Sequence, residues 1–218
     1  PEDTSMRINL ARLEARRGDA ASACDHACRA QKGATGDAQQ SNSLASVYYD
    51  IGDLETAKEM ADRALAQNPD LADAHNNLGN ILTRLGALEA AIAEFGLALG
   101  KNPDNPDYLA NLGGTHQAAG NLAAAMACFD NAIKADPGHV DAHWNRGLAR
   151  LLGGDLAPGF ADYEWRWRLP EFHRRHTDIP AWTGDDLNGR SLLIHSEQGF
   201  GDTIQCIRYA ALLSERGA

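Results

Sequence analysis

Small and apolar residues recur along the chain at intervals of 34 positions. The recurring set comprises leucine, glycine, alanine, phenylalanine and proline at fixed offsets. It runs through Leu78, Gly79, Gly86, Ala91, Phe95, Ala98 and Pro103, and returns one interval later as Leu112, Gly113, Gly120, Ala125, Phe129, Ala132 and Pro137. Earlier matches are Leu44, Gly52, Ala57, Ala64 and Pro69, then Leu10, Gly18, Ala23 and Ala30. A period of this length predicts an array of similar supersecondary units.

Five units tile residues 4–173, at 4–37, 38–71, 72–105, 106–139 and 140–173. In each unit, small residues at the eighth and twentieth positions allow two helices to approach closely. Glycine at the fifteenth position ends the first helix, and proline at the thirty-second follows the second. Each unit is therefore predicted to be two helices joined by a tight turn. Such units bury a core only by stacking on their neighbours, so the predicted fold class is an all-α solenoid.

This pattern resembles the tetratricopeptide repeat family over about three quarters of the chain. The resemblance implies a right-handed superhelix whose concave groove is lined by the first helices and takes a protein or an extended peptide. The last unit departs from the pattern, because Arg146 replaces an apolar residue and Gly159 replaces alanine. We interpret it as a terminal repeat with altered faces.

Asparagine occupies the sixth position of three successive units, at Asn77, Asn111 and Asn145, with Ser43 in the unit before. Asparagine is a poor choice for a helix interior, but its amide both donates and accepts hydrogen bonds and can therefore bind a peptide backbone. The column resembles the asparagine ladder in the repeats of protein O-linked N-acetylglucosamine transferases. The alternative is that asparagine is simply common at this position of the repeat. Asn76 and Asn80 are assigned to the same groove.

An acidic column accompanies the asparagines at the second position, formed by Asp73, Asp107 and Asp141. These carboxylates either adapt the groove to a basic partner or favour the positive helix N-termini. The formal net charge of the chain is −10, which argues against nucleic acid or an anionic membrane as the partner.

No part of the sequence is suited to cross a bilayer, since the longest uncharged apolar run covers only residues 122–129 and a membrane span needs about twenty residues. Four cysteines without C-x-x-C spacing indicate a reducing, cytoplasmic setting, although the chain starts at proline and an upstream signal stays open. Cys24, His26 and Cys28 cannot complete a zinc shell from one helix face, so no metal site is predicted. His75 and His143, at the fourth position, are expected to pack.

Aromatic and basic residues alternate from Tyr163 to Arg168 at the end of the last unit. Because Tyr163 and Trp167 are four residues apart on a predicted helix, we expect them to bury one stripe while the arginines face outward. This stretch is interpreted as a capping or interdomain surface. The alternative is a contact of Arg174 and Arg175 with a phosphate or polyanion.

The repeat period is lost after Phe172, and the composition changes. Residues 174–190 are predicted to be a linker, 191–195 a short strand, and 196–202 a glycine loop that leads into an amphipathic helix. This order of strand, loop and helix opens a Rossmann-like unit. Gly199 and Gly201 alone are weak evidence for a phosphate site, because Glu197 and Asp202 would repel phosphate.

The segment from Glu197 to Gln205, with Arg208-Tyr209 after it and Trp182-Thr-Gly184 before it, resembles the start of the catalytic domain in bacterial tetratricopeptide-repeat glycosyltransferases related to the heptosyltransferases. The resemblance implies that residues 191–218 are the first strand and helix of a truncated GT-B-type domain. It implies that Asp202 is the general base and that Glu197, Gln198, Gly199 and Gly201 form the acceptor loop. The parent enzyme would use a nucleotide-sugar donor.

Residues 191–218 leave no room for a donor site, so the chain alone is predicted to be inactive and without a cofactor. Asp202 could instead be only a helix N-cap. The alternative function is a non-enzymatic adaptor or assembly scaffold in which residues 174–218 cap the solenoid. A lone strand at 191–195 would expose its backbone groups, so it is predicted to pair with another molecule or to lie against the last repeat.

Overall fold

The computed structural model describes residues 3–33, 37–169, 172, 178–180, 182, 184–186, 189–194 and 210–215. The chain divides into two compact units, residues 1–169 and residues 170–218. The described part of the first unit consists of helices only, and α-helices follow one another in pairs. The pairs are α1 (Thr4–Arg16) with α2 (Ala20–Gly33), α3 (Ala38–Ile51) with α4 (Leu54–Gln67), α5 (Ala72–Arg84) with α6 (Leu88–Lys101), α7 (Pro106–Ala118) with α8 (Leu122–Ala135), and α9 (Val140–Leu152) with α10 (Leu156–Tyr163).

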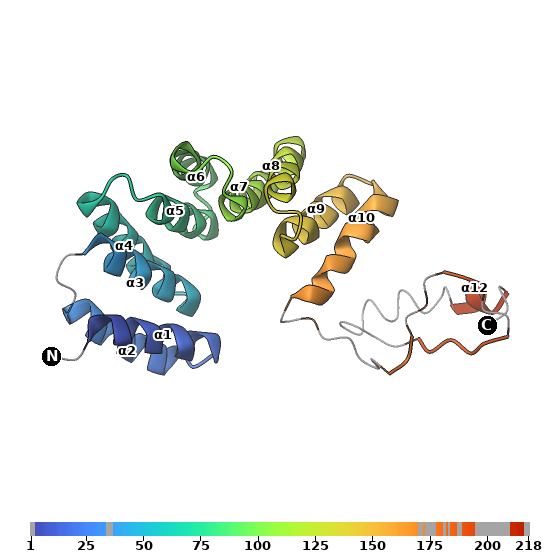
Figure 1. Ribbon diagram of the computed structural model, residues 1–218, viewed down its shortest axis with the longest axis horizontal. Coiled ribbons are helices and arrows are strands. Elements are labelled where there is room, and N and C mark those ends of the chain that lie inside the picture. Colours follow the sequence, from blue (N-terminus) through green and yellow to red (C-terminus); the bar gives the residue numbers. More distant parts are fainter. Residues whose placement is uncertain are drawn as a thin grey trace. The chain divides into compact units, whose positions relative to one another are not determined.

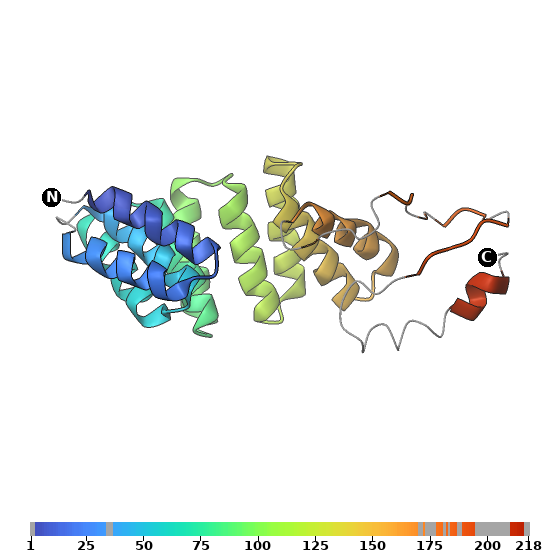
Figure 2. The same cartoon turned by 90° about the horizontal axis from the view of Figure 1, so that it is seen from below.

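Each pair packs against the pair before it and the pair after it, as Figures 1 and 2 show for the part of the chain coloured from blue to orange. The second helix of one pair contacts the first helix of the next, and successive first helices also touch. This arrangement confirms the predicted all-α solenoid of stacked helix pairs.

The predicted turn glycines have the backbone conformation that their role requires. Gly52, Gly86 and Gly120 have φ values of 87°, 81° and 78°, in the left-handed region that only glycine adopts without strain. Each follows a first helix and lets the chain reverse within two or three residues. The helix that follows Gly52 has a side-chain cap, because Asp53 accepts a hydrogen bond from the backbone N–H of Thr56 at 3.1 Å. Asn121, at the N-cap of α8, makes no such bond.

The small residues at the eighth position lie where two helices are in contact. A Cβ atom built on Gly79 would come within 2.8 Å of the Phe95 ring, and one on Gly113 within 2.5 Å of the Phe129 ring. Phe95 and Phe129 are fully buried. In these two pairs, a phenylalanine of the second helix therefore lies directly on a glycine of the first.

The last pair differs from the others in its second helix. α10 ends at Tyr163, after eight residues, and continues as a 3-10 helix, η1 (Glu164–Arg168). The tighter η1 contacts α9. The predicted continuous second helix is therefore wrong for the end of this unit.

The second unit is described in short segments, which include the helix α12 (Ala210–Glu215). Residues 191–194, predicted as most of a strand, have no regular secondary structure, and the described residues contain no strand to which they could pair. Since a strand is stabilised by a partner's backbone hydrogen bonds, the apolar run alone did not produce one. The predicted loop residues Glu197, Gln198, Gly199, Gly201 and Asp202 lie outside the described residues. No described helix is long and apolar enough to cross a membrane.

Candidate protein-binding surface

The sixth-position asparagines of the third and fourth pairs each bind an asparagine of the preceding first helix. Asn77 Nδ2 donates to Asn42 Oδ1 at 2.8 Å, and Asn111 Nδ2 donates to Asn76 Oδ1 at 3.0 Å. The same atoms of the same positions thus meet at two successive junctions. The amides hold neighbouring repeats in register, a role that the sequence analysis did not assign to them.

The row of amide pairs ends at the last repeat. Asn145 is at the sixth position of α9, but the fifth position of the preceding first helix is the buried Ala110, which has no side-chain acceptor. Asn80 lies one turn beyond Asn77 on α5 and is half-buried. The structure therefore brings Asn76, Asn77 and Asn111 into one row and adds Asn42. Asn42 does not follow from the 34-residue period, because the two asparagines in contact are 35 residues apart and occupy different positions of the repeat.

The acidic column also serves the contacts between repeats. Asp73 accepts a hydrogen bond from the hydroxyl of the buried Tyr108 on the next first helix. Burial and the neighbouring Asp73 raise the pKa of Tyr108 to about 12, so its hydroxyl keeps its proton to donate. Asp141 is exposed on α9.

Asp107 binds the N-cap of the next first helix. His139 Nδ1 accepts from the backbone N–H of Ala142 at 3.1 Å, and its Nε2 lies 2.9 Å from Asp107 Oδ1. Because Nδ1 accepts, the ring proton is on Nε2 and is donated to the carboxylate. Asp73 and Asp107 thus bind the next first helix or its N-cap, which neither interpretation of the column had predicted.

The fourth-position histidines are buried and form polar contacts. His75 Nε2 lies 2.9 Å from the carbonyl oxygen of Pro69, and its Nδ1 lies 2.7 Å from Glu94 Oε2. A carbonyl only accepts, so Nε2 must donate. The ring therefore connects the end of one repeat to the second helix of the next, as expected for a histidine that packs between helices.

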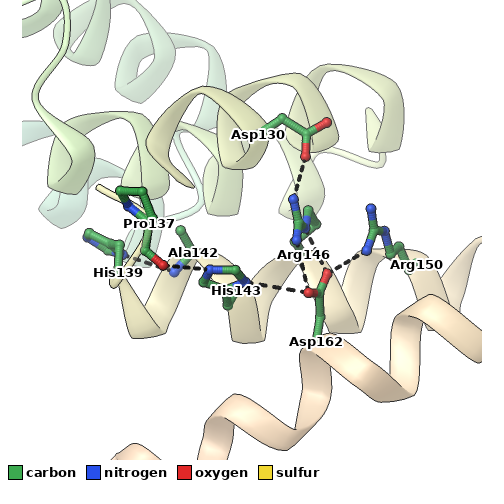
Figure 3. Close-up of polar contacts among 8 residues, drawn as sticks. All are labelled: Asp130, Pro137, His139, Ala142, His143, Arg146, Arg150 and Asp162. Carbon is green, nitrogen blue, oxygen red and sulfur yellow. Dashed lines mark hydrogen bonds and ion pairs between the residues drawn. The ribbon is translucent and has the colours of Figure 1, made fainter. Parts of the chain in front are cut away.

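In the last repeat the fourth-position histidine, His143, belongs to a larger ionic cluster, which Figure 3 shows. His143 Nε2 lies 3.1 Å from the carbonyl oxygen of Pro137, and Nδ1 lies 3.4 Å from Asp162 Oδ1. Asp162, on α10, also accepts from Arg146 and Arg150 of α9. Arg146 reaches Asp130 on α8 with its remaining nitrogen, at 2.8 Å.

This cluster explains why an arginine replaces the expected apolar residue at position 146. Burial by itself would raise the pKa of Asp162, but hydrogen bonds and charge from Arg146, with His143 and Arg150, outweigh burial and lower it. The carboxylate is therefore stable as an anion between two guanidinium groups. Arg146 binds both acids at once, so it joins α10 to α9 and α9 to α8 by charge where other repeats use leucine.

The aromatic and basic stretch folds back onto the last repeat. Trp165 stacks on the His143 ring at 3.7 Å between centroids, and the Arg168 guanidinium lies 3.9 Å from the centroid of the same Trp165 ring. Arg166 is buried between the rings of Tyr163 and Trp167, 4.4 Å from each centroid. The expectation that the arginines face outward is therefore wrong for Arg166, because the 3-10 helix turns it inward.

The cysteine pair of α2 has the geometry of neighbours on one helix face. Cys24 Sγ and Cys28 Sγ lie 3.9 Å apart, and Tyr48 Oη donates to Gln31 Oε1 at 2.9 Å beside them. Within the described residues, no group of three or more histidine, cysteine or acidic side chains could hold a metal ion.

Comparison with known proteins supports the repeat scaffold. A sequence model of the tetratricopeptide repeat matches residues 42–106 and 111–163, which is more than half of the chain. The sequence has no significant match among curated proteins.

Solved structures with the same arrangement include the type IV pilus biogenesis factor PilW, at 22% identity and a TM-score of 0.67 over 80% of each chain. A thermophilic repeat protein from Thermus thermophilus is 19% identical, with a TM-score of 0.67 over 78% of this chain and 92% of its own. YrrB, described as a repeat protein with an unusual peptide-binding site, is 22% identical, with a TM-score of 0.52 over 79% and 89%.

Proposed function

The chain belongs to the tetratricopeptide repeat family, and we propose that it is a protein-binding module that takes an extended peptide along the amide row of its first helices. The observation that carries this proposal is the repetition of one amide pair, Asn42 with Asn77 and Asn76 with Asn111, at two successive junctions. A primary amide has two N–H donors and an oxygen with two lone pairs. One bond per pair orients the amides and leaves further donors and acceptors for a ligand.

Orientation by a neighbour favours binding. An asparagine that is already held in one rotamer loses less conformational freedom when a ligand arrives. Groups that recur once per repeat suit a ligand that also repeats, and the peptide backbone offers an N–H and a C=O at each residue. The module is therefore expected to contact main chain and to read side chains less strictly. Similarity to YrrB, with its described peptide-binding site, is consistent with this ligand class.

The test uses a peptide selected from a random displayed library against the wild-type protein. Asn111→Ala removes an amide of the row together with a bond between repeats. Asn145→Ala removes the sixth-position amide beyond the row, where the preceding first helix has Ala110 at the facing position and no bond between repeats is lost. Loss of one or two hydrogen bonds is expected to weaken binding by about tenfold. Asn131→Ala, on the exposed side of α8, is the matched control. Unchanged affinity of both Asn111→Ala and Asn145→Ala for the selected peptide would refute the proposal that the asparagine amides bind it.

Backbone recognition has its own test. Methylating single peptide nitrogens of the selected ligand removes donors without changing side chains, and it is expected to abolish binding at some positions. If every methylated peptide binds as well as the parent, the ligand is recognised through its side chains.

The glycosyltransferase interpretation of residues 182–209 stays a prediction from sequence. Asp202 and its loop lie outside the described residues, and the comparisons concern the repeats. The prediction that the purified chain does not turn over nucleotide sugars is tested by measuring donor hydrolysis. Self-association through residues 191–195 and the scaffold alternative also remain predictions.

A further inference from the structure

Two thiols of α2 face each other across one helical turn. Cys24 and Cys28 are four residues apart, the spacing at which side chains of a helix are neighbours, and their Sγ atoms lie 3.9 Å apart. Cys28 is exposed and Cys24 is half-buried, so solvent reaches the pair. The pair belongs to a second helix, whereas the amide row belongs to first helices. Its chemistry is therefore separate from the proposed binding of a peptide.

A disulfide between these thiols does not fit an intact helix. A disulfide needs Cβ atoms about 3.5–4.5 Å apart, whereas residues four apart on a helix have their Cβ atoms about 5–6 Å apart. Both cysteines lie well inside α2, so direct oxidation would have to unwind a turn. The structure accordingly holds them as two free thiols.

A metal ion between the two sulfurs removes this mismatch. Two metal–thiolate bonds of about 2.3 Å, the length found for zinc, span the observed 3.9 Å when the angle at the ion is about 115°. The backbone of α2 stays helical, because only side-chain torsions have to adjust. Among the described residues no group of three or more potential ligands is found. An ion that needs four protein ligands, such as structural zinc, is therefore not held here.

The surroundings of the pair favour a soft cation. Tyr48 is buried on α3 and places its hydroxyl oxygen 3.6 Å from Cys28 Sγ. The carboxylates of Asp53 and Asp25 act on Cys24 through their charge, which opposes negative sulfur atoms unless a cation lies between them. Thiolate is a soft ligand, and it selects copper(I) as well as zinc. Copper(I) is therefore the ion that two thiolates suit.

We propose that Cys24 and Cys28 bind copper(I) as two thiolates that bridge one turn of α2. On binding, two S–H bonds break, two copper–sulfur bonds form, and two protons pass to solvent. The oxidation state of copper and sulfur does not change, so the step needs no oxidant or reductant. Copper(I) reaches the site from the side of Cys28, the exposed thiol, and on that side a third ligand from solvent can complete its coordination.

The experiment is an anaerobic titration of the full chain with copper(I) against a chromogenic copper(I) chelator. The variant with Cys128→Ser and Cys206→Ser retains only the cysteines of α2 and is expected to bind one ion per chain. Adding Cys24→Ser or Cys28→Ser is expected to weaken binding at least about 100-fold, which exceeds what partners behind the metal ligands contribute. Zinc(II) is the comparison ion and is expected to bind at least about 100-fold more weakly than copper(I), because two thiolates leave half of its ligands missing.

A matched control keeps two thiols and moves one of them off the shared face. Cys28→Ser with Arg29→Cys, in the same background, places the second thiol five residues from Cys24, which is a different face of the helix. Arg29 is exposed, so the substitution disturbs no core contact. This control is expected to bind copper(I) as weakly as the variants with one thiol. Circular dichroism of each variant checks that its helices are intact.

Three outcomes would overturn the proposal. If the variant that retains only the cysteines of α2 does not compete with the chelator, copper bound by the wild type belongs to other thiols. If the Arg29→Cys control binds as tightly as the pair, any two thiols suffice and the geometry of α2 makes no site. If zinc(II) binds as tightly as copper(I), further ligands complete a tetrahedral site of another kind.

Discussion

Arg146 binds Asp162 through two hydrogen bonds, Nε to Oδ2 at 2.7 Å and Nη2 to Oδ1 at 2.9 Å. The parallel arrangement is the strong form of this ion pair. The pair connects the two helices of the last repeat. Because both side chains are largely buried, water screens little of the attraction between their charges.

Asp162→Asn is expected to destabilise the last repeat by about 3 kcal/mol, because it removes the buried carboxylate that Arg146 and Arg150 share and leaves Arg146 with the exposed Asp130 alone. Urea unfolding followed by circular dichroism measures the loss. Asp130→Asn is the control, since Asp130 is exposed and an exposed ion pair contributes less than about 1 kcal/mol. Equal effects of the two variants would show that burial of the pair is unimportant.

Replacing both partners is expected to cost less than replacing one. Arg146→Leu with Asp162→Met copies the combination that the second repeat has at Leu44 and Met60. A hydrophobic pair of this kind removes the desolvation cost of the charges. The double variant is expected to unfold at a higher urea concentration than Asp162→Asn. An unfolding midpoint below that of Asp162→Asn would contradict this prediction.

The carboxylate of Asp162 also makes the stability of the fold depend on pH in acidic solution. The folded-state pKa of Asp162 is lowered by Arg146, His143 and Arg150 against the opposing effect of burial. Its contribution is therefore complete above the unfolded-state pKa of about 3.9 and is lost as pH falls through the lower folded-state value. The wild-type unfolding midpoint is expected to fall more steeply than that of Asp162→Asn below about pH 4. Parallel curves would assign the acid sensitivity to other carboxylates.

Two adjacent glycines of α7 are expected to respond oppositely to alanine. Gly113→Ala places a methyl group 2.5 Å from the buried Phe129 ring and is expected to destabilise by about 1–3 kcal/mol through overpacking. Gly114→Ala meets no atom within 4 Å and is expected to stabilise by up to about 1 kcal/mol, since alanine favours the helix. The unfolding temperatures of both variants test this prediction. A higher unfolding temperature for Gly113→Ala would contradict the close contact between Gly113 and the Phe129 ring.

The two thiols of α2 are expected to react at different rates. Cys28 is exposed, whereas Cys24 is half-buried and its pKa is raised by burial and by the neighbouring Cys28. A thiol reacts as its thiolate, so Cys28 is expected to be modified first by a chromogenic disulfide reagent. Rates are compared for Cys24→Ser and Cys28→Ser with Cys128 and Cys206 replaced by serine. Faster reaction of Cys24 would contradict the expected order.

The repeat is visible in sequence because each of its signals is local. Gly86 ends a helix through its own backbone, and Phe95 recurs at a fixed distance from Gly79 within one unit, so composition and spacing suffice to predict the helix pairs. The last repeat was harder to predict. Arg146 reads as a defect in the pattern until the structure places Asp162 and Asp130 on either side of it.

The sequence by itself determined the helix pairs, their order and the row of asparagines, since these follow from a period along the chain. Only the tertiary structure decided what the polar residues bind. Asn77 meets Asn42 and Asp73 meets Tyr108, because these outcomes depend on which helix lies beside which. Contacts between neighbouring repeats join residues that share no local signal, and a helix face is covered or exposed according to a neighbour that its own sequence does not specify.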